Sequence, residues 1–285
     1  MSTTTGAVSR STGQRNLKRR IISAAVGIPI VFLAVFGGLP GVSVLALLAA
    51  VIAGWELASM AGVTGRAKAV AALPPAALTA AVVFIAAAAD DTGAAVPVVL
   101  IAAGVAGIGI TVMLRASMAN LVRGASVAMA AAALYFGALL AHGPAVASLA
   151  SGRDWLIMAL IVTFAVDTAA FVTGRSIGKT RLAPRISPNK TWEGAAAGFV
   201  AGPAAALPVN ALVGPGLDWW VAALAGLALA VAGMLGDLAE SGLKRSAGVK
   251  DSGQIIPGHG GILDRIDSLA PSIAVVYWVA LWSGA

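Results

Sequence analysis

The sequence contains no cysteine, and charged residues are scarce in it. The absence of cysteine excludes a disulfide framework, a cysteine nucleophile and thiolate metal sites. Charged residues make up 11% of the chain and hydrophobic residues 59%, and the mean hydropathy of +0.92 lies far above the range of soluble domains. No stretch between the apolar runs is long enough for a soluble domain with its own core. The composition therefore indicates an integral membrane protein.

The apolar residues gather in nine runs, most of them close to the roughly 20 residues that a helix needs to cross a bilayer. Their approximate ranges are 21–38, 41–62, 69–89, 95–114, 124–142, 155–174, 194–213, 217–236 and 265–284. The runs are continuous rather than alternating, which favours helices over the strands of a transmembrane barrel. The 34 glycines suit helices that pack closely in a membrane. We therefore predict an all-α, polytopic membrane protein with about nine transmembrane helices.

The 19 lysine and arginine residues lie mainly between the apolar runs, and their distribution predicts an orientation. With a cytoplasmic N-terminus, nine spans place 18 of the 19 on the cytoplasmic side and only Arg153 outside. A wrong number of helices would have mixed the two sides, so this segregation supports the count. The net charge of +7 then belongs to segments that face anionic lipid, and we expect no nucleic-acid partner. We predict a multi-pass protein of the plasma membrane whose C-terminus lies outside.

The polar segments divide the chain into three parts. Residues 1–20 end in a basic cluster and predict a disordered cytoplasmic tail. Residues 21–150 predict an N-terminal scaffold of about five helices, in which Glu56 is intramembrane and stays without an assigned role. Residues 151–285 predict about four helices with two long polar cytoplasmic segments, 175–193 and 237–264. Because the polar residues concentrate there, we expect the chemistry in this C-terminal region and the active site on the cytoplasmic face.

Residues 236–267 carry five carboxylates in an otherwise apolar chain. If the helix of the eighth run continues, one of its faces holds Asp237, Glu240, Ser241 and Lys244. Asp264 and Asp267 lie one turn apart at the start of the last run. Carboxylate oxygens are the ligands that Mg²⁺ prefers, and the ion keeps positions for water and substrate phosphates. These residues predict a metal site, and the alternative is a set of solvated charges paired with Lys244, Arg245 and Arg265.

Between the two acidic groups lies a glycine-rich segment with the sequence KDSGQIIPGHGG. Its glycines allow positive φ and close backbone approach, as a phosphate-binding loop needs: Gly253, Gly258, Gly260 and Gly261. Lys250 adds a positive charge for phosphate oxygens. His259 can donate to a phosphate or orient a ligand, although a structural role is an equal alternative.

A second polar segment, SPNKTWEG at residues 187–194, leads into the seventh run. Its first half has side chains of the types that contact phosphates and bases: Ser187, Asn189, Lys190 and Thr191. A helix that begins near Thr191 would present free N–H groups to an anion. Glu193 either ligates metal or caps that helix. Asp167 lies inside the sixth run and is expected to line a polar cavity shared with both segments, or to pair with a neighbouring helix.

Together these residues resemble the phosphatidate cytidylyltransferases, also called CDP-diacylglycerol synthases. The family signature has five parts with fixed spacing, which read here Ser241, Lys244-Arg245, Lys250-Asp251, His259-Gly260-Gly261 and Asp264-Arg265-Ile266-Asp267. A second family element, Ser-Pro-x-Lys-Thr-x-Glu-Gly, matches residues 187–194. The resemblance covers motifs in roughly residues 160–270, whereas for residues 1–150 it rests on the hydrophobic layout alone.

The resemblance implies that CTP and phosphatidic acid react in the bilayer to give CDP-diacylglycerol and pyrophosphate, with Mg²⁺ as cofactor. The resemblance leaves open whether there are two metal ions and whether a monovalent cation also binds. As metal ligands we expect Asp237 and Asp264, with Asp267, Glu240 and Asp167 as further candidates. We expect the negative charge of the triphosphate or the lipid phosphate to be neutralised by Lys244, Lys250 and His259. The residues expected to contact the substrates are Ser187, Asn189, Lys190, Thr191, Glu193, Ser241, Arg245, Gly260, Gly261 and Arg265.

Two other functions are consistent with parts of the sequence. A CTP-dependent lipid kinase needs similar metal and phosphate groups. A transporter would use the intramembrane carboxylates Asp167 and Glu56 as an ion pathway, but the polar residues gather at one membrane face rather than at the midplane. Small-residue helix faces also allow a homodimer without establishing one.

Overall fold

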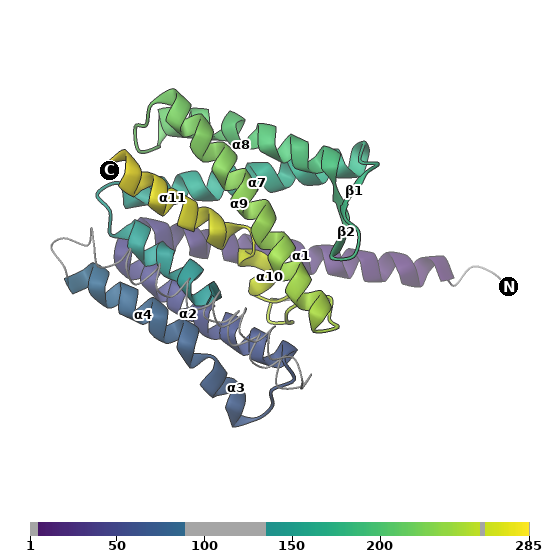
Figure 1. Cartoon of the computed structure of the whole chain (residues 1–285). Helices are drawn as coiled ribbons and strands as arrows, with labels where there is room; N and C mark the ends of the chain where they lie inside the picture. Colours follow the sequence, from purple (N-terminus) through teal and green to yellow (C-terminus); the bar gives the residue numbers. More distant parts are fainter. Residues whose placement is uncertain (1–4, 89–134, 257–259, 285) are drawn as a thin grey trace, which may run out of the picture.

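The computed structural model describes residues 5–88, 135–256 and 260–284 and is mostly helical (Figure 1). The N-terminal helices are α1 (Thr5–Phe36), α2 (Gly38–Met60), α3 (Arg66–Ala71) and α4 (Leu73–Ala88). Residues 135–147 form a further helix. The C-terminal helices are α7 (Gly152–Ser176), α8 (Trp192–Leu212), α9 (Trp219–Ser246), α10 (Leu263–Ile266) and α11 (Leu269–Ser283).

Four of the described helices are long and apolar enough to cross a membrane, namely α2, α7, α8 and α9. Three shorter apolar helices cover residues 21–36, 73–88 and 269–283. The prediction of a mostly helical chain with several helices of membrane-spanning length is thereby confirmed. The predicted run at 95–114 lies outside the described residues, and the run at 124–142 does so in part, so the count of nine spans stays a prediction.

The N-terminal tail differs from its predicted state. We expected residues 1–20 to be disordered, but α1 begins at Thr5 and continues without a break into the first apolar run. The physical reason is that extending a helix beyond an existing span adds a hydrogen bond per residue and needs no new nucleus. The tail also contains several good helix formers, among them arginine, lysine, leucine and glutamine.

The eighth and ninth apolar runs form helices, and the ends of these helices position the polar residues. The α9 helix continues ten residues beyond the predicted end of its run, to Ser246, so the expected polar helix face is present. The last run is instead split into α10 and α11 at Asp267 and Ser268. Pro271 explains the break, because it has no N–H to donate to the carbonyl of Asp267 four residues earlier. A Cβ at Gly236 would lie 2.1 Å from that carbonyl oxygen, so α9 touches the break directly.

A two-stranded antiparallel hairpin departs from the predicted all-α fold. Strand β1 (Arg181–Ala183) pairs with β2 (Ser187–Thr191), with Arg181 opposite Thr191. The amide of Trp192 donates to the carbonyl of Thr180, which ties the hairpin to the start of α8. The two prolines of this segment explain why it was predicted as a loop, since proline removes a ladder donor and is confined to sheet edges or ends.

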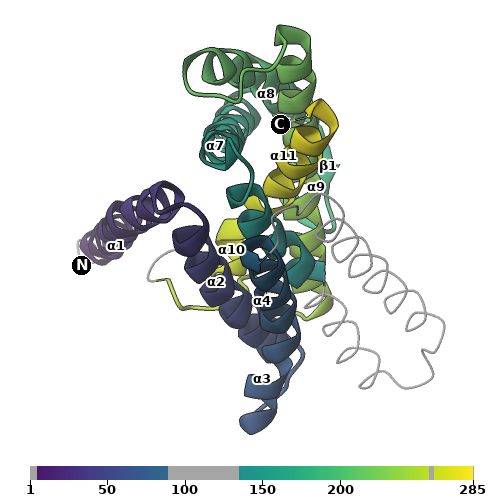
Figure 2. The same ribbon diagram turned by 90° about the vertical axis from the view of Figure 1, so that its left-hand side faces the viewer.

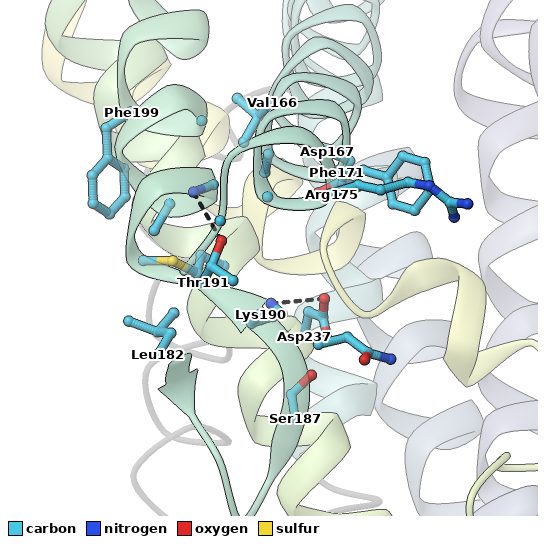
Figure 3. Close-up of a pocket in the computed structure, with 18 of the residues that line it drawn as sticks. Val166, Asp167, Phe171, Arg175, Leu182, Ser187, Lys190, Thr191, Phe199 and Asp237 are labelled. Carbon is cyan, nitrogen blue, oxygen red and sulfur yellow. Dashed lines mark hydrogen bonds and ion pairs between the residues drawn. The ribbon is translucent and has the colours of Figure 1, made fainter. Parts of the chain in front are cut away.

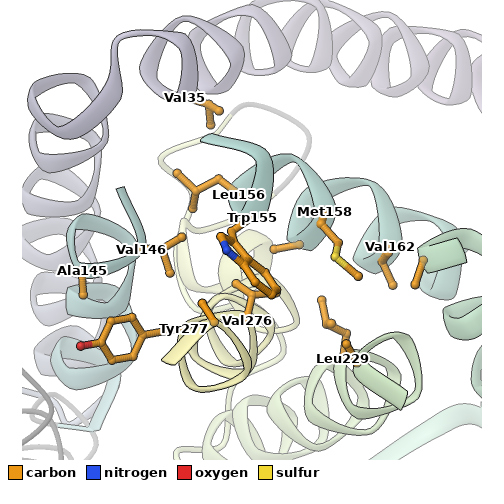
Figure 4. Packing of buried hydrophobic residues seen from close by; sticks show 14 of the residues in the cluster. Val35, Ala145, Val146, Trp155, Leu156, Met158, Val162, Leu229, Val276 and Tyr277 are labelled. Atoms are coloured by element: carbon orange, nitrogen blue, oxygen red, sulfur yellow. The ribbon is translucent and has the colours of Figure 1, made fainter. Parts of the chain in front are cut away.

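The helices pack as two groups around one core (Figures 1 and 2). In the C-terminal group α8 packs between α7 and α9, and α11 packs against α9 and α7; in the N-terminal group α2 packs against α1, α3 and α4. The main apolar cluster surrounds the fully buried Trp155 and draws residues from both groups, including Val35 of α1 and Val276 of α11 (Figure 4). The N-terminal helices are therefore part of the same packed body as the C-terminal polar residues.

Candidate active site

A cavity of about 660 Å³ opens between α7, α8, α9 and the hairpin. One part of its lining is polar and comes from three separate segments: Asp167, Arg175, Arg181, Ser187, Asn189, Lys190, Thr191 and Asp237. The other part is apolar and includes Val166, Phe171, Phe199 and Met234 (Figure 3). Phe171 of α7 is 66% exposed, so the apolar part reaches the surface of the molecule.

The hairpin and α9 meet at an ion pair inside this cavity (Figure 3). Lys190 Nζ lies 2.7 Å from Asp237 Oδ2, and the Ser241 hydroxyl donates to Asp237 Oδ1 at 3.2 Å. Asp167 and Arg175 reach the same cavity from α7. The structure thus brings together Asp167, the segment 187–191 and Asp237, which the sequence places on separate elements.

The start of α8 is capped as its sequence suggests. Thr191 is the N-cap residue, and its hydroxyl accepts a hydrogen bond from the Gly194 amide at 3.1 Å. The Glu193 carboxylate accepts from the Thr180 amide at 3.1 Å and does not line the cavity. In this structure Glu193 therefore fastens the hairpin to α8.

A second polar cluster lies where α9 meets α10. Lys244 Nζ contacts both Glu240 Oε2 and Asp264 Oδ1. Asp264 Oδ2 accepts hydrogen bonds from the amides of Ser252 and Gly261 and from the Ser252 hydroxyl, at 3.0, 2.8 and 2.9 Å. Burial alone would raise the pKa of Asp264, but Lys244 and these amides outweigh it and hold that pKa below its ordinary value.

Two glycines of the His-Gly-Gly motif are required by this geometry. Gly260 has φ +85°, a conformation that favours glycine. A Cβ at Gly261 would lie 2.1 Å from the Ser252 hydroxyl oxygen. His259 itself falls outside the described residues. Both glycines thus let the loop close over Asp264.

The comparisons with known proteins assign the chain to a family. A model of the cytidylyltransferase family matches residues 18–282, nearly the whole chain. The chain belongs to the cytidylyltransferase family. The matched region contains both polar clusters and the N-terminal helices from residue 18 onward.

Curated relatives match a shorter part of this cytidylyltransferase-family chain. A phosphatidate cytidylyltransferase of Brucella suis is 46% identical over 126 residues, which are 44% of this chain and 46% of the relative. One of Staphylococcus haemolyticus is 45% identical over 122 residues, 43% and 47% of the two chains. One of Mycobacterium tuberculosis H37Rv is 38% identical over 146 residues, 51% and 42%. The chain thus spans about half the length of the curated relatives it matches.

Asp267 connects the two clusters electrostatically. Its Oδ1 accepts from the Ser268 amide at 2.8 Å. Asp237 and Asp167 lie close enough to repel its negative charge. Carboxylates that repel one another in this way are stabilised by a cation, so their chemistry suits Mg²⁺. In the part of the chain that the structure describes, no three such side chains are placed to hold a metal by themselves, and Mg²⁺ commonly uses one or two carboxylates with water and substrate phosphates.

The remaining predicted residues occupy different places in this family member. Arg245 donates to the carbonyls of Ile186 and Val249, at 3.3 and 2.8 Å, and so braces the hairpin against the end of α9. Lys250 is exposed in the loop that follows α9, and Arg265 is exposed on α10.

Sequence reasoning missed three residues of these clusters. Arg175 and Arg181 line the cavity; their basic character was counted only for orientation. Glu56 contacts the loop of the second cluster, and its one signal in the sequence was a charge inside an apolar run.

Proposed function

We propose that this chain is a phosphatidate cytidylyltransferase, which transfers CMP from CTP to the phosphate of phosphatidic acid and releases pyrophosphate. The observation that carries the proposal is that one cavity joins a polar wall holding Lys190 and Asp237 to an apolar wall holding Phe171 and Phe199. A nucleoside triphosphate needs the first kind of surface, and a diacyl lipid needs the second. The names of the matched relatives support the same reaction.

The reaction asks for charge compensation and alignment rather than for a side-chain nucleophile. A phosphate oxygen of phosphatidic acid forms a bond to the α-phosphorus of CTP, and the bond from that phosphorus to the oxygen bridging to the β-phosphorus breaks. Pyrophosphate leaves with that oxygen. Lys190, Arg175 and Arg181 line the cavity, and positive groups there would bring the two anions together and stabilise the charge that grows on the leaving group.

The metal assignment made from the sequence is kept in this proposal. Mg²⁺ held by Asp237 and Asp264 would compensate charge on the triphosphate, with Asp267, Glu240 and Asp167 nearby as further donors. Within the chain, Lys190 and Lys244 already bind these two carboxylates. The lysines offset the negative charge of these carboxylates and would remain close to the phosphates.

Replacement of Asp264 tests the metal assignment. Asp264→Ala and Asp264→Asn should each abolish turnover in folded protein at any Mg²⁺ concentration, because both remove the anionic oxygens. The measurement is the rate of CDP-diacylglycerol formation against Mg²⁺ concentration, with folding checked by thermal unfolding in detergent. Near-normal activity of either variant would contradict the assignment.

The function itself is tested by product analysis. Purified protein is incubated with labelled CTP, phosphatidic acid and Mg²⁺, and lipid and aqueous products are separated. A cytidylyltransferase leaves the cytidine label on the lipid and releases pyrophosphate. Release of CDP with transfer of the γ-phosphate to the lipid would instead identify a lipid kinase, and flux of a solute across liposomes without CTP consumption would identify a transporter.

The orientation and assembly predicted from the sequence belong to the same proposal. A cytoplasmic N-terminus and nine spans would place both polar segments, and hence the cavity, on the side where CTP is available. The segregation of lysine and arginine supports this arrangement. A homodimer stays a prediction.

A further inference from the structure

Glu56 lies in the last two turns of the membrane-length helix α2 and is almost completely buried. Its side chain is 2% exposed, and among the residues that the structure describes it forms no ion pair with a lysine or arginine. A buried carboxylate is costly unless hydrogen bonds compensate for the lost water. The hydrogen bonds that Glu56 makes therefore indicate its role.

All of these contacts join α2 to the glycine-rich loop, about 200 residues further along the chain. Glu56 Oε1 accepts from the Ile262 amide at 2.9 Å. Its Oε2 accepts from the Leu263 amide at 3.1 Å and lies 3.0 Å from the Ser252 hydroxyl oxygen, whose single proton it shares with Asp264 Oδ2. One side chain thus holds both ends of the loop that runs from Ser252 to Leu263.

The loop backbone lies so close to this carboxylate that side chains would not fit. A Cβ at Gly253 would lie 2.6 Å from Glu56 Oε1, and a Cβ at Gly261 would lie 2.5 Å from both carboxylate oxygens. The glycines at these two positions therefore let the loop backbone pack directly against Glu56.

Glu56 and Asp264 hold the same two segments of the loop. The Ser252 hydroxyl lies 3.0 Å from Glu56 Oε2 and 2.9 Å from Asp264 Oδ2. Asp264 Oδ2 also accepts from the Gly261 amide, and Glu56 from the amides of the next two residues. Any shift of the loop relative to α2 would move the donors that orient Asp264.

Apolar packing keeps the two elements together at the same place. Leu57, which follows Glu56, and Leu263, whose amide it binds, are both fully buried in one small cluster with Ala53 and Phe136. The N-terminal helices thus supply a rigid support for the loop rather than only a place in the membrane.

We propose that Glu56 is a positioning residue for the reaction: it fixes the loop from Ser252 to Leu263 against α2 and thereby sets the orientation of Asp264. This inference rests on the proposed function, because Asp264 matters there as a metal ligand. Glu56 acts through the loop and does not itself touch substrate.

The experiment compares three variants with the unmodified full-length protein. Glu56→Gln keeps the size of the side chain but removes its charge and one acceptor. Ser252→Ala removes only the bridging hydroxyl. Ser43→Ala is the matched control, because Ser43 lies on the same helix, is 5% exposed and has a hydroxyl without a hydrogen-bond partner in the described structure.

Two readouts are taken for each variant. The first is kcat, KM for CTP and the Mg²⁺ concentration for half-maximal activity. Glu56→Gln should lower kcat about 10- to 100-fold and raise the Mg²⁺ requirement, as removal of a residue that orients a metal ligand does, with little change in the midpoint of thermal unfolding. The second is hydrogen exchange of the Ile262 and Leu263 amides, which should become at least about tenfold faster because both lose an ionised acceptor. Ser252→Ala should show a smaller effect in the same direction, and Ser43→Ala none.

The outcomes separate the inference from the function on which it rests. Unchanged kcat, Mg²⁺ requirement and exchange in Glu56→Gln overturn the inference. So does a loss of activity matched by an equal loss of folded protein. If Glu56→Gln does not fold, Ser252→Ala is the test instead. Unchanged kcat, Mg²⁺ requirement and amide exchange in Ser252→Ala would then overturn the inference. Inactive wild-type protein overturns the proposed function instead, and the exchange measurement still reports whether Glu56 fixes the loop.

Discussion

Lys190 and Lys244 each place an ammonium group against the carboxylates of the two polar clusters. Lys190 joins the hairpin to Asp237 of α9, and Lys244 joins Glu240 of its own helix to Asp264. A lysine ammonium is a compact charge on a flexible stem, so it can turn from a carboxylate to a phosphate without a change in the backbone. Both lysines are suited to hold the anionic groups of the site before the substrates arrive.

Replacement of Lys190 tests this role at the level of one side chain. Lys190→Ala should lower kcat/KM for CTP by about 10²- to 10³-fold, because a charge that faces the phosphates is lost, and should leave Asp237 without its cation. Lys179→Ala is the control, since Lys179 is exposed and lies outside the cavity lining. Steady-state kinetics at saturating Mg²⁺ makes the comparison. Equal kinetics of the two variants would show that Lys190 does not face the substrate.

At the level of elements, α8 and α9 meet through their backbones. A Cβ at Gly202 would lie 2.3 Å from the carbonyl oxygen of Gly226, and a Cβ at Gly226 would lie 2.5 Å from that of Gly202. Small residues allow such approach between membrane helices, where packing rather than the hydrophobic effect drives association. This contact sets how far apart the helices that carry Thr191 and Asp237 can lie.

Gly202→Ala should therefore damage both stability and the site. The added methyl group has no room, so we expect a loss of about 1–3 kcal/mol in the free energy of unfolding together with reduced turnover. Gly27→Ala is the matched control, because no atom lies within 4 Å of a Cβ at Gly27. Unfolding by denaturant in detergent gives the comparison. A Gly202→Ala protein as stable as Gly27→Ala would show that α8 and α9 do not pack as described.

Much of the helical framework follows from the sequence, because long apolar runs and helix-capping residues are local signals. The run at 194–213 became α8, Trp192–Leu212, with Thr191 as its N-cap. The run at 155–174 became α7, Gly152–Ser176. The polar extension of α9 was likewise expected from the spacing of Asp237 and Lys244.

The features that were missed depend on contacts between distant segments. The hairpin is the exception, because its pairing is local: its strands have three and five residues and one contains Pro188, so no period of two marks it. The partners of Glu56 lie 196 to 207 residues away, and no spacing along the chain points to them. The break before α11 needs Pro271 and also the close passage of Gly236.

For the molecule as a whole, the length of α8 indicates whether the polar segments before and after it lie on the same side of the membrane. Its 21 residues span about 32 Å at 1.5 Å per residue, which matches the roughly 30 Å hydrocarbon core of a bilayer. The hairpin before it and the turn after it should therefore lie on opposite sides. With the predicted orientation, the hairpin side is cytoplasmic.

The absence of cysteine makes this arrangement directly measurable, because any introduced thiol is the sole one in the chain. Lys179→Cys, before the hairpin, should react with a membrane-impermeant maleimide only after the membrane is opened, since the positive segments face the cytoplasm. Val213→Cys, which follows α8 at a position 46% exposed, should react in intact cells. The parent protein, without a thiol, gives the background. Labelling of both positions from the same side would show that α8 does not cross the membrane, and an exchange of the two results would show that the cavity faces outward, away from the supply of CTP.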